Sequence, residues 1–144
     1  MNELLNKEPV KRVEESLKKF DSNLKIIVLD TTARTAKDAA NSLKCELGAI
    51  VKSLVFKTED TFIICLVSGD KRCSLNKLKK ILNKKDVAMA NADQVKENTG
   101  FSIGGVAPTG HLKKLNIIVD KSLSRFKYVY GAAGHPDCVF RITY

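Results

Sequence analysis

The sequence of 144 residues has no long apolar run and little glycine or proline. None of its hydrophobic stretches approaches the roughly 20 consecutive apolar residues that a membrane-spanning helix needs. Residues 1–15 mix charges of both signs and lack the apolar segment of a secretory signal. Eight glycines and three prolines are too few for a fibrous or low-complexity chain. We therefore expect a soluble, globular protein that has no membrane partner.

Cysteine and histidine are also scarce. The four cysteines include no C-x-x-C pair, and the two histidines, His111 and His135, stand in no pattern that is typical of a metal site. Cys45 is interpreted as a small core residue, because no Cys/His/Asp order matches a protease signature. Without a secretory signal, reduced thiols are the expected state. The sequence thus predicts a cytoplasmic protein with no metal, no cofactor and no disulfide bond.

Acidic residues are outnumbered, and this imbalance is the first indication of function. The chain has 25 Lys and Arg against 16 Asp and Glu, a formal net charge of +9 that attracts polyanions. Part of this excess is concentrated in one segment, with Lys71, Arg72, Lys77, Lys79, Lys80, Lys84 and Lys85. Contact with nucleic-acid phosphates requires such a cluster. We select Lys71, Arg72, Lys77 and Lys80 as candidate nucleic-acid-binding residues; charge alone leaves open a basic protein with solvated lysines.

Hydrophobic periodicity predicts alternating helices and strands in the first half of the chain. A helix is expected over 9–20, starting at Pro9, and a buried strand over 25–29. Thr35 can cap the next helix, with Asp38 at the position of a capping-box acid and alanines on one face. Two strand-like runs, 50–57 and 61–68, read as a hairpin.

The second half continues the alternation. Ser74 and Asn91 can each cap a helix, and the second of these helices ends at Gly100. Further strands are expected over 87–90, 115–119, 128–130 and 138–142, with glycine-rich loops at 101–111 and 131–137. A chain of this size can bury roughly two thirds of its unfolded surface in one core. We therefore predict one α/β (α+β) domain over residues 1–144, with a central mixed sheet flanked by helices.

The segment from Gly104 through Gly105 and Pro108 to His111 carries no charge before the histidine. Glycines let a ligand approach the main chain closely, and backbone amides can then stabilise an oxyanion or a carbonyl group. The segment is neither a Walker loop nor a dinucleotide loop. An ordinary helix-to-strand connection remains the alternative.

Two charged or titratable positions are further candidates. Lys52 interrupts an otherwise apolar strand, where a solvated lysine is the simpler interpretation. His135 and Asp137 could form an acid/base pair, although Pro136 between them fixes a turn and a histidine in a surface loop is often inert.

Four blocks in order resemble the YbaK/EbsC family of trans-editing proteins, which are related to the editing domain inserted in prolyl-tRNA synthetase. The blocks are TARTAKDAANSLKCELGAIVKSLVFK, FIICLVSGDKRCSLNKL, ENTGFSIGGVAPTGH and DKSLSRFKYVYGAAGHPDCVF. The resemblance covers almost the whole chain. It implies an aminoacyl-tRNA deacylase that hydrolyses the ester of a wrong small amino acid at the 3′ acceptor end of tRNA, without a metal.

The resemblance also implies site residues. The family's lysine in a K-[ST]-L strand matches Lys52, followed by Ser53, and its G-x-x-x-P loop matches Gly104 to Pro108 with Gly105 inside. Lys52, Gly104, Gly105 and Pro108 are therefore the expected catalytic residues. Ser53 and His135 are secondary candidates. His135 is secondary because the family's C-terminal histidine does not align squarely with it.

Two other functions remain open at this point. A non-catalytic tRNA-binding module, or one that associates with an aminoacyl-tRNA synthetase, would keep the basic surface without turnover. A small-molecule regulatory domain would use the pocket but leave the positive charge unexplained. An aminoacyl ester is already activated, so positioning, fixed dipoles and a water molecule can hydrolyse it without a strong nucleophile.

Overall fold

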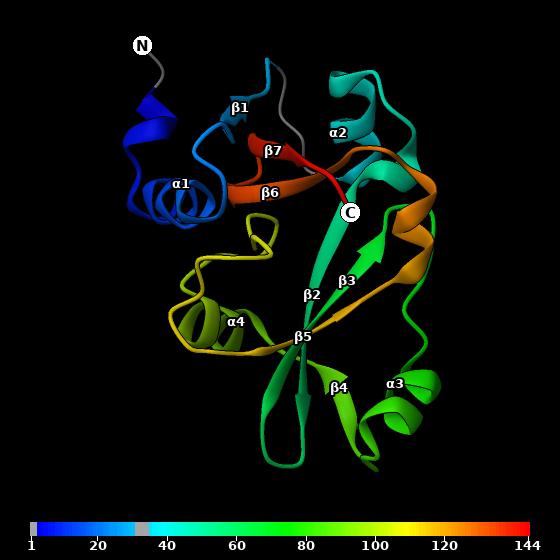
Figure 1. The fold of residues 1–144 in the computed structure, drawn as a ribbon. Coiled ribbons are helices and arrows are strands. Elements are labelled where there is room, and N and C mark those ends of the chain that lie inside the picture. Colours follow the sequence, from blue (N-terminus) through cyan, green and yellow to red (C-terminus); the bar gives the residue numbers. More distant parts are fainter. Residues whose placement is uncertain (1–2, 31–34) are drawn as a thin grey trace.

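Two β-sheets organise the part of the chain that the computed structural model describes, residues 3–30 and 35–144 (Figure 1). The larger sheet has the order β4-β2-β3-β5, formed by Val87–Met89, Val51–Thr58, Phe62–Ser68 and Asn116–Val119. The smaller has the order β1-β7-β6, formed by Ile26–Val28, Cys138–Ile142 and Val129–His135. The first three residues of the first family-like block, 32–34, lie outside the described residues.

The larger sheet is mixed, as the sequence predicts. Strand β2 pairs antiparallel with β3 and β4, whereas β3 pairs parallel with β5. A parallel bridge between Ile50 and Tyr130 connects the larger sheet to the smaller one. The predicted α/β domain with a central mixed sheet is confirmed, and the second sheet is a feature that the hydrophobic pattern did not reveal.

Helices begin where local capping chemistry indicates. The described α-helices are α1 (Glu8–Phe20), α2 (Ala36–Leu43), α3 (Leu75–Leu82) and α4 (Ala92–Thr99), with short 3-10 helices η1 (Glu3–Asn6), η2 (Leu47–Ala49) and η3 (Lys121–Arg125). The hydroxyls of Thr35 and Ser74 cap α2 and α3, and Asn91 forms a capping box with Gln94. Within the described ranges, no helix combines the length and apolar character of a membrane span.

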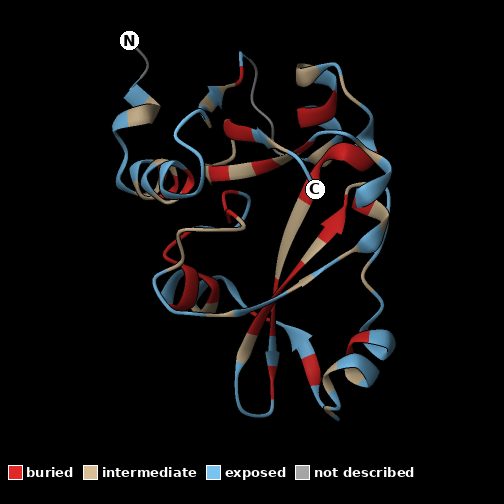
Figure 2. Ribbon diagram, viewed as in Figure 1, coloured by how far each residue is buried: buried red, intermediate tan, exposed pale blue. Residues whose placement is uncertain are grey.

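Alternation along β2 divides the core between the two faces of the larger sheet. Val55 belongs to a cluster with Val13 of α1, while the next residue, Phe56, packs in a cluster with Leu78 of α3. Figure 2 shows buried positions along β2 and β3. This two-sided packing fixes β2, the strand that carries Lys52.

The expected loop at 131–137 is wrong for most of its length, because β6 continues to His135. Its glycines permit close packing. A Cβ atom on Gly134 would lie 2.7 Å from the main chain of Pro9, and one on Gly131 would lie 3.2 Å from the ring of Phe140. Glycine in a strand often marks such a close approach of two backbones. The glycines that suggested a loop therefore allow β6 to pack directly against α1.

Candidate active site

A cavity of about 280 Å³ lies where the start of β2 meets α2, β6 and the glycine-rich loop. Its lining brings together Lys52, Ser53 and Gly104, which are far apart in the sequence. Most of the remaining wall is apolar and includes Ala36, Ala39, Ile50, Leu54, Ile103, Val106, Ala132 and Val139. A few polar groups in an apolar cavity of this kind are typical of a small-ligand site.

An uncovered stretch of β2 forms part of the cavity wall. Strand β4 covers only the far end of β2, where the Ala90 amide donates to the Val55 carbonyl at 3.0 Å, and β6 reaches the start of β2 at the Ile50–Tyr130 bridge. In an antiparallel strand, every second residue points its N–H and C=O groups to the same edge. Ser53 stands two residues before Val55, so its main-chain N–H and C=O groups also point to the edge away from β3. The Ser53 hydroxyl is buried and has no hydrogen-bond partner among the described residues.

Among the described residues, one main-chain carbonyl holds the ammonium group of Lys52. Its Nζ atom donates a hydrogen bond of 2.5 Å to the carbonyl of Lys71, in the turn that follows β3. An ammonium carries three N–H bonds, so protons remain for a ligand. The lysine therefore stands as an oriented cation beside the cavity.

A tight turn presents Gly104 to the cavity. The Gly105 amide donates to the Ser102 carbonyl at 3.0 Å, and Gly104 has a φ of 92°, as expected at the third position of a type II turn. The Gly105 carbonyl accepts a hydrogen bond of 3.0 Å from the Gly134 amide. Both main-chain groups of Gly105 are thus occupied, and the amide of Gly104 donates no hydrogen bond within the described residues.

Pro108 does not reach this cavity. It lines a second, mainly apolar cavity of about 420 Å³ on the side of α1 and the C-terminal strand. Gly131 of β6 and Val51 of β2 contribute to both linings, so the two spaces adjoin. The structure therefore separates the two ends of the G-x-x-x-P loop, with Gly104 at the first cavity and Pro108 at the second.

Helix α1 anchors the loop, through residues that sequence reasoning did not select. Arg12 donates from Nε to the Gly110 carbonyl at 2.6 Å, and its guanidinium lies 4.6 Å from the ring centre of Phe101. Ser16 and Thr109 share a hydrogen bond of 2.5 Å. His111 contacts the Ala107 carbonyl through Nε2 at 2.7 Å, and burial lowers the pKa of its imidazole. In the sequence, this anchor is indicated only by a charged residue, Arg12, within the amphipathic helix predicted over 9–20.

His135 and Asp137 contact each other through the turn that joins β6 to β7. The Asp137 amide donates to Nδ1 of His135 at 3.0 Å, so the neutral ring carries its hydrogen on Nε2. Among the described residues that line the first cavity, Pro136 is present, whereas His135 and Asp137 are not. His135 therefore lies at the end of β6, next to the turn and outside the cavity lining that contains Lys52.

The basic segment begins beside the site and extends away from it. Lys71 belongs to the turn that receives the Lys52 ammonium, and Arg72 comes next, while Lys77 and Lys80 lie on α3 (Figure 1). All four are exposed. Lys84, by contrast, forms an ion pair with Asp60 at 3.0 Å. The four candidate tRNA-binding residues are therefore accessible to a polyanion.

The cysteines belong to the packed interior or its margin. Cys45 is partly buried at the end of α2, where burial raises the pKa of its thiol. Cys65 and Cys73 are free thiols with their sulfur atoms 3.9 Å apart. In the described ranges, no group of three or more His, Cys, Asp or Glu side chains is placed to hold a metal ion.

Comparison with known proteins identifies this arrangement. The family model of the aminoacyl-tRNA editing domain matches residues 30–144. The chain belongs to the aminoacyl-tRNA editing domain family. A crystal structure of a candidate trans-editing enzyme for prolyl tRNA synthetase shares the editing-domain fold with a TM-score of 0.90 and 38% identity, over 95% of this chain and 87% of that one.

Relatives of this editing domain occur within synthetases and as separate proteins. The proline–tRNA ligase of Bacillus velezensis is 30% identical over 138 residues, which cover 96% of this chain and 23% of the ligase. The ligase of Thermosipho africanus is 36% identical over 100 residues, 69% of this chain and 18% of the ligase. The chain thus spans about a fifth of these ligases. The protein YwhH of Bacillus subtilis is 29% identical over 135 residues, 93% of this chain and 85% of YwhH.

Proposed function

We propose that this protein is an aminoacyl-tRNA deacylase, which hydrolyses the ester of a small, wrongly attached amino acid. The observation that carries the proposal is the convergence of Lys52, the Ser53 edge and Gly104 on one cavity in an editing-domain fold. A module that only binds tRNA has no need for a cavity that gathers a cation and a main-chain turn around one small space.

The size and lining of the cavity favour a small amino acid. About 280 Å³ is too little for the terminal adenosine and an aminoacyl group together, so the amino acid enters and the nucleoside stays outside. Alanines from α2 and β6 form part of the wall, and the main-chain groups of Ser53 can bind the α-ammonium or the carbonyl of the substrate.

Hydrolysis at this site requires fixed dipoles and an oriented water molecule. The Gly104 amide can donate to the oxyanion that forms when water attacks the ester carbonyl. The Lys52 ammonium can neutralise developing negative charge or bind the terminal ribose and its phosphate. Water then supplies the hydroxyl of the amino acid's free carboxyl group. The ester bond between the carbonyl carbon and the ribose oxygen breaks, and this oxygen takes up the remaining proton of the water to become a ribose hydroxyl of the tRNA.

The exposed lysines supply the affinity for tRNA in this proposal. Lys71 and Arg72 continue from the site, and Lys77 and Lys80 offer further phosphate contacts. The named relatives are ligases for proline, so tRNA specific for proline is the first partner to test, and its synthetase is a second. Because aminoacyl-tRNA is used in the cytoplasm, we propose that compartment for the activity.

A panel of misacylated tRNAs tests the proposal. Proline-specific tRNA charged with alanine, serine, threonine or cysteine is mixed with excess protein, and the loss of ester is followed in a single turnover. We expect rapid hydrolysis of at least one of the four and none of correctly charged tRNA. Binding of the whole panel without hydrolysis would support the synthetase-associated tRNA-binding module instead.

A further inference from the structure

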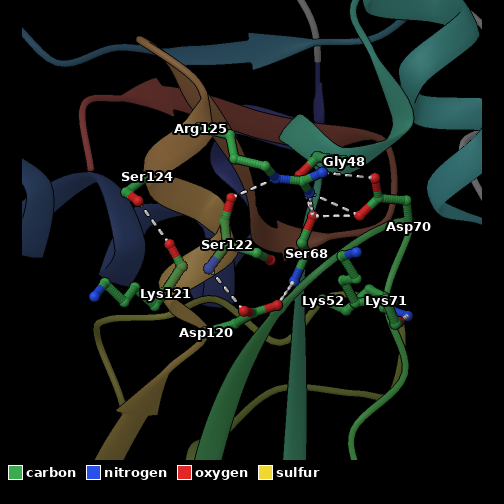
Figure 3. Close-up of polar contacts among 10 residues, drawn as sticks. All are labelled: Gly48, Lys52, Ser68, Asp70, Lys71, Asp120, Lys121, Ser122, Ser124 and Arg125. Atoms are coloured by element: carbon green, nitrogen blue, oxygen red, sulfur yellow. Dashed lines mark hydrogen bonds and ion pairs between the residues drawn. The ribbon is translucent and has the colours of Figure 1, made fainter.

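The orientation of Lys52 depends on a turn outside the cavity. The carbonyl that accepts the Lys52 ammonium belongs to Lys71, and the Lys71 amide donates back to the Ser68 carbonyl at 3.0 Å. Residues 68–71 therefore form the support of the lysine. Whatever fixes this turn also fixes the ammonium (Figure 3).

An ion pair fixes the turn from the opposite side. Arg125 of η3 donates to Asp70 through both terminal nitrogens, at 2.8 Å to Oδ1 and 3.2 Å to Oδ2 (Figure 3). The Ser68 hydroxyl donates to Asp70 Oδ1 at 2.9 Å and lies 2.9 Å from a terminal nitrogen of Arg125. Paired contacts of this kind fix the geometry of both partners as well as their distance.

Neighbouring groups hold both members of the pair in place. Arg125 also donates from Nε to the Ser122 carbonyl at 2.7 Å. The Ser68 amide donates to Oδ2 of Asp120 at 3.0 Å, which ties the start of the turn to the segment before η3. A Cβ atom on Gly48 would lie 2.8 Å from Asp70 and 2.9 Å from Arg125, so η2 packs directly on the pair.

The placement of the pair suggests more than stability. A partly exposed ion pair generally contributes little to the stability of the fold. Arg125 and Asp70 are 42% and 35% exposed, yet they link η3 to the turn whose Lys71 carbonyl accepts the Lys52 ammonium. Arginine contacts lower the pKa of Asp70 to about 2, which keeps its carboxylate charged at neutral pH.

We propose that Arg125 and Asp70 are positioning residues, which hold the 68–71 turn so that the Lys71 carbonyl aims the Lys52 ammonium at the cavity. This inference rests on the proposed deacylase function for its catalytic consequence. Neither residue lines the cavity, so their effect on a reaction passes through Lys52.

A double-mutant cycle tests the proposal through the rate. Asp70→Asn removes the negative charge of the carboxylate with little change in side-chain shape. The substitution is made in two backgrounds, the natural protein and the Lys52→Ala variant. We expect single-turnover hydrolysis to fall roughly tenfold to a hundredfold in the first background, as small misplacements do, and less than twofold in the second. Arg125→Lys should restore part of the rate that Arg125→Ala loses, while half-saturating tRNA concentrations stay unchanged.

The matched control is Asp60→Asn, which removes the charge of a carboxylate that pairs with Lys84 away from the site. It should leave the rate unchanged. Equal losses from Asp70→Asn in both Lys52 backgrounds would show that the pair acts on the fold and would overturn the proposal.

A second measurement follows the ammonium itself and is independent of turnover. The ¹H–¹⁵N signal of the Lys52 ammonium, assigned by its loss in Lys52→Arg, should be shifted or broadened in Asp70→Asn and unchanged in Asp60→Asn. An unchanged Lys52 signal in Asp70→Asn would refute the positioning role, even if the natural protein hydrolyses the ester as proposed. Absence of hydrolysis in the natural protein, with the expected change of this signal, would refute the deacylase function and leave the positioning role intact.

Discussion

The carbonyl of Gly105 accepts a hydrogen bond of 3.0 Å from the amide of Gly134, and the two glycines touch across the loop and β6. A Cβ atom on Gly105 would lie 2.9 Å from the main chain of Gly134 and His135, which cannot move aside as a flexible side chain could. Contact between these two backbones sets where the Gly104 turn stands relative to the cavity.

Gly105→Ala should therefore displace the loop. We expect deacylation to fall by roughly 100-fold or more, comparable to losing one oxyanion donor, with a lower melting temperature and nearly unchanged tRNA affinity. Single-turnover assays and tRNA titrations check this. Equal losses of binding and hydrolysis would instead make the loop a docking element.

Gly104→Ala is the informative neighbour of that variant. A Cβ atom at Gly104 would meet only the Pro136 ring at 3.4 Å, but the φ of 92° disfavours any side chain by roughly 1–2 kcal/mol. We expect a smaller loss of melting temperature than in Gly105→Ala and a clear loss of rate. A natural rate of hydrolysis in Gly104→Ala would contradict the proposal that the Gly104 amide donates to the oxyanion.

Local signals in the sequence predicted the helices and the central hairpin. Thr35, Ser74 and Asn91 cap their helices through contacts within three residues, which a sequence displays directly. Glycines 131 and 134 indicated a loop, whereas the partners that make them part of a strand, Phe140 and Pro9, come from other elements.

The candidate site was predictable only in part, for the same reason. Lys52, Ser53 and Gly104 were recognisable through the family resemblance, and they line one cavity. The position of Pro108 at the other cavity, the anchor formed by Arg12 and the pair formed by Arg125 and Asp70 all depend on contacts between distant segments. Periodicity and spacing carry no information about such contacts.

The buried imidazole of His111 predicts a dependence of stability on pH. Burial lowers its pKa in the folded protein below the ordinary value of 6.5. Well above pH 6.5 the ring is neutral in both the folded and the unfolded state and adds no pH dependence. As the pH falls below that value, the unfolded chain binds a proton that the folded protein does not, so the free energy of unfolding decreases.

Thermal unfolding from pH 7.5 to 5 checks this expectation. His111→Gln should lose melting temperature less steeply on acidification than the natural protein, and His135→Gln is the control for removing a histidine. Parallel curves for His111→Gln and the natural protein would exclude this contribution.

Binding of tRNA should depend steeply on salt, because the proposed contacts are lysines and an arginine on phosphates. Replacing Lys77 and Lys80 together by alanine should weaken binding and reduce the slope of log affinity against log salt by about one to two units. Titrations between low and physiological salt measure the slope. No slope in the natural protein would show that the Lys71–Lys80 surface does not bind tRNA.

The most direct test of the account compares two lysines of the same strand. Lys52 lines the cavity, whereas Lys57 is exposed at the far end of β2. The assay is single-turnover hydrolysis of alanine-charged, proline-specific tRNA, or of whichever of the four esters the natural protein cleaves fastest. Lys52→Ala should lose most of the rate with little change in melting temperature. Lys57→Ala should keep the natural rate. Equal rates in the natural protein and in Lys52→Ala would contradict the assignment of this cavity as the active site.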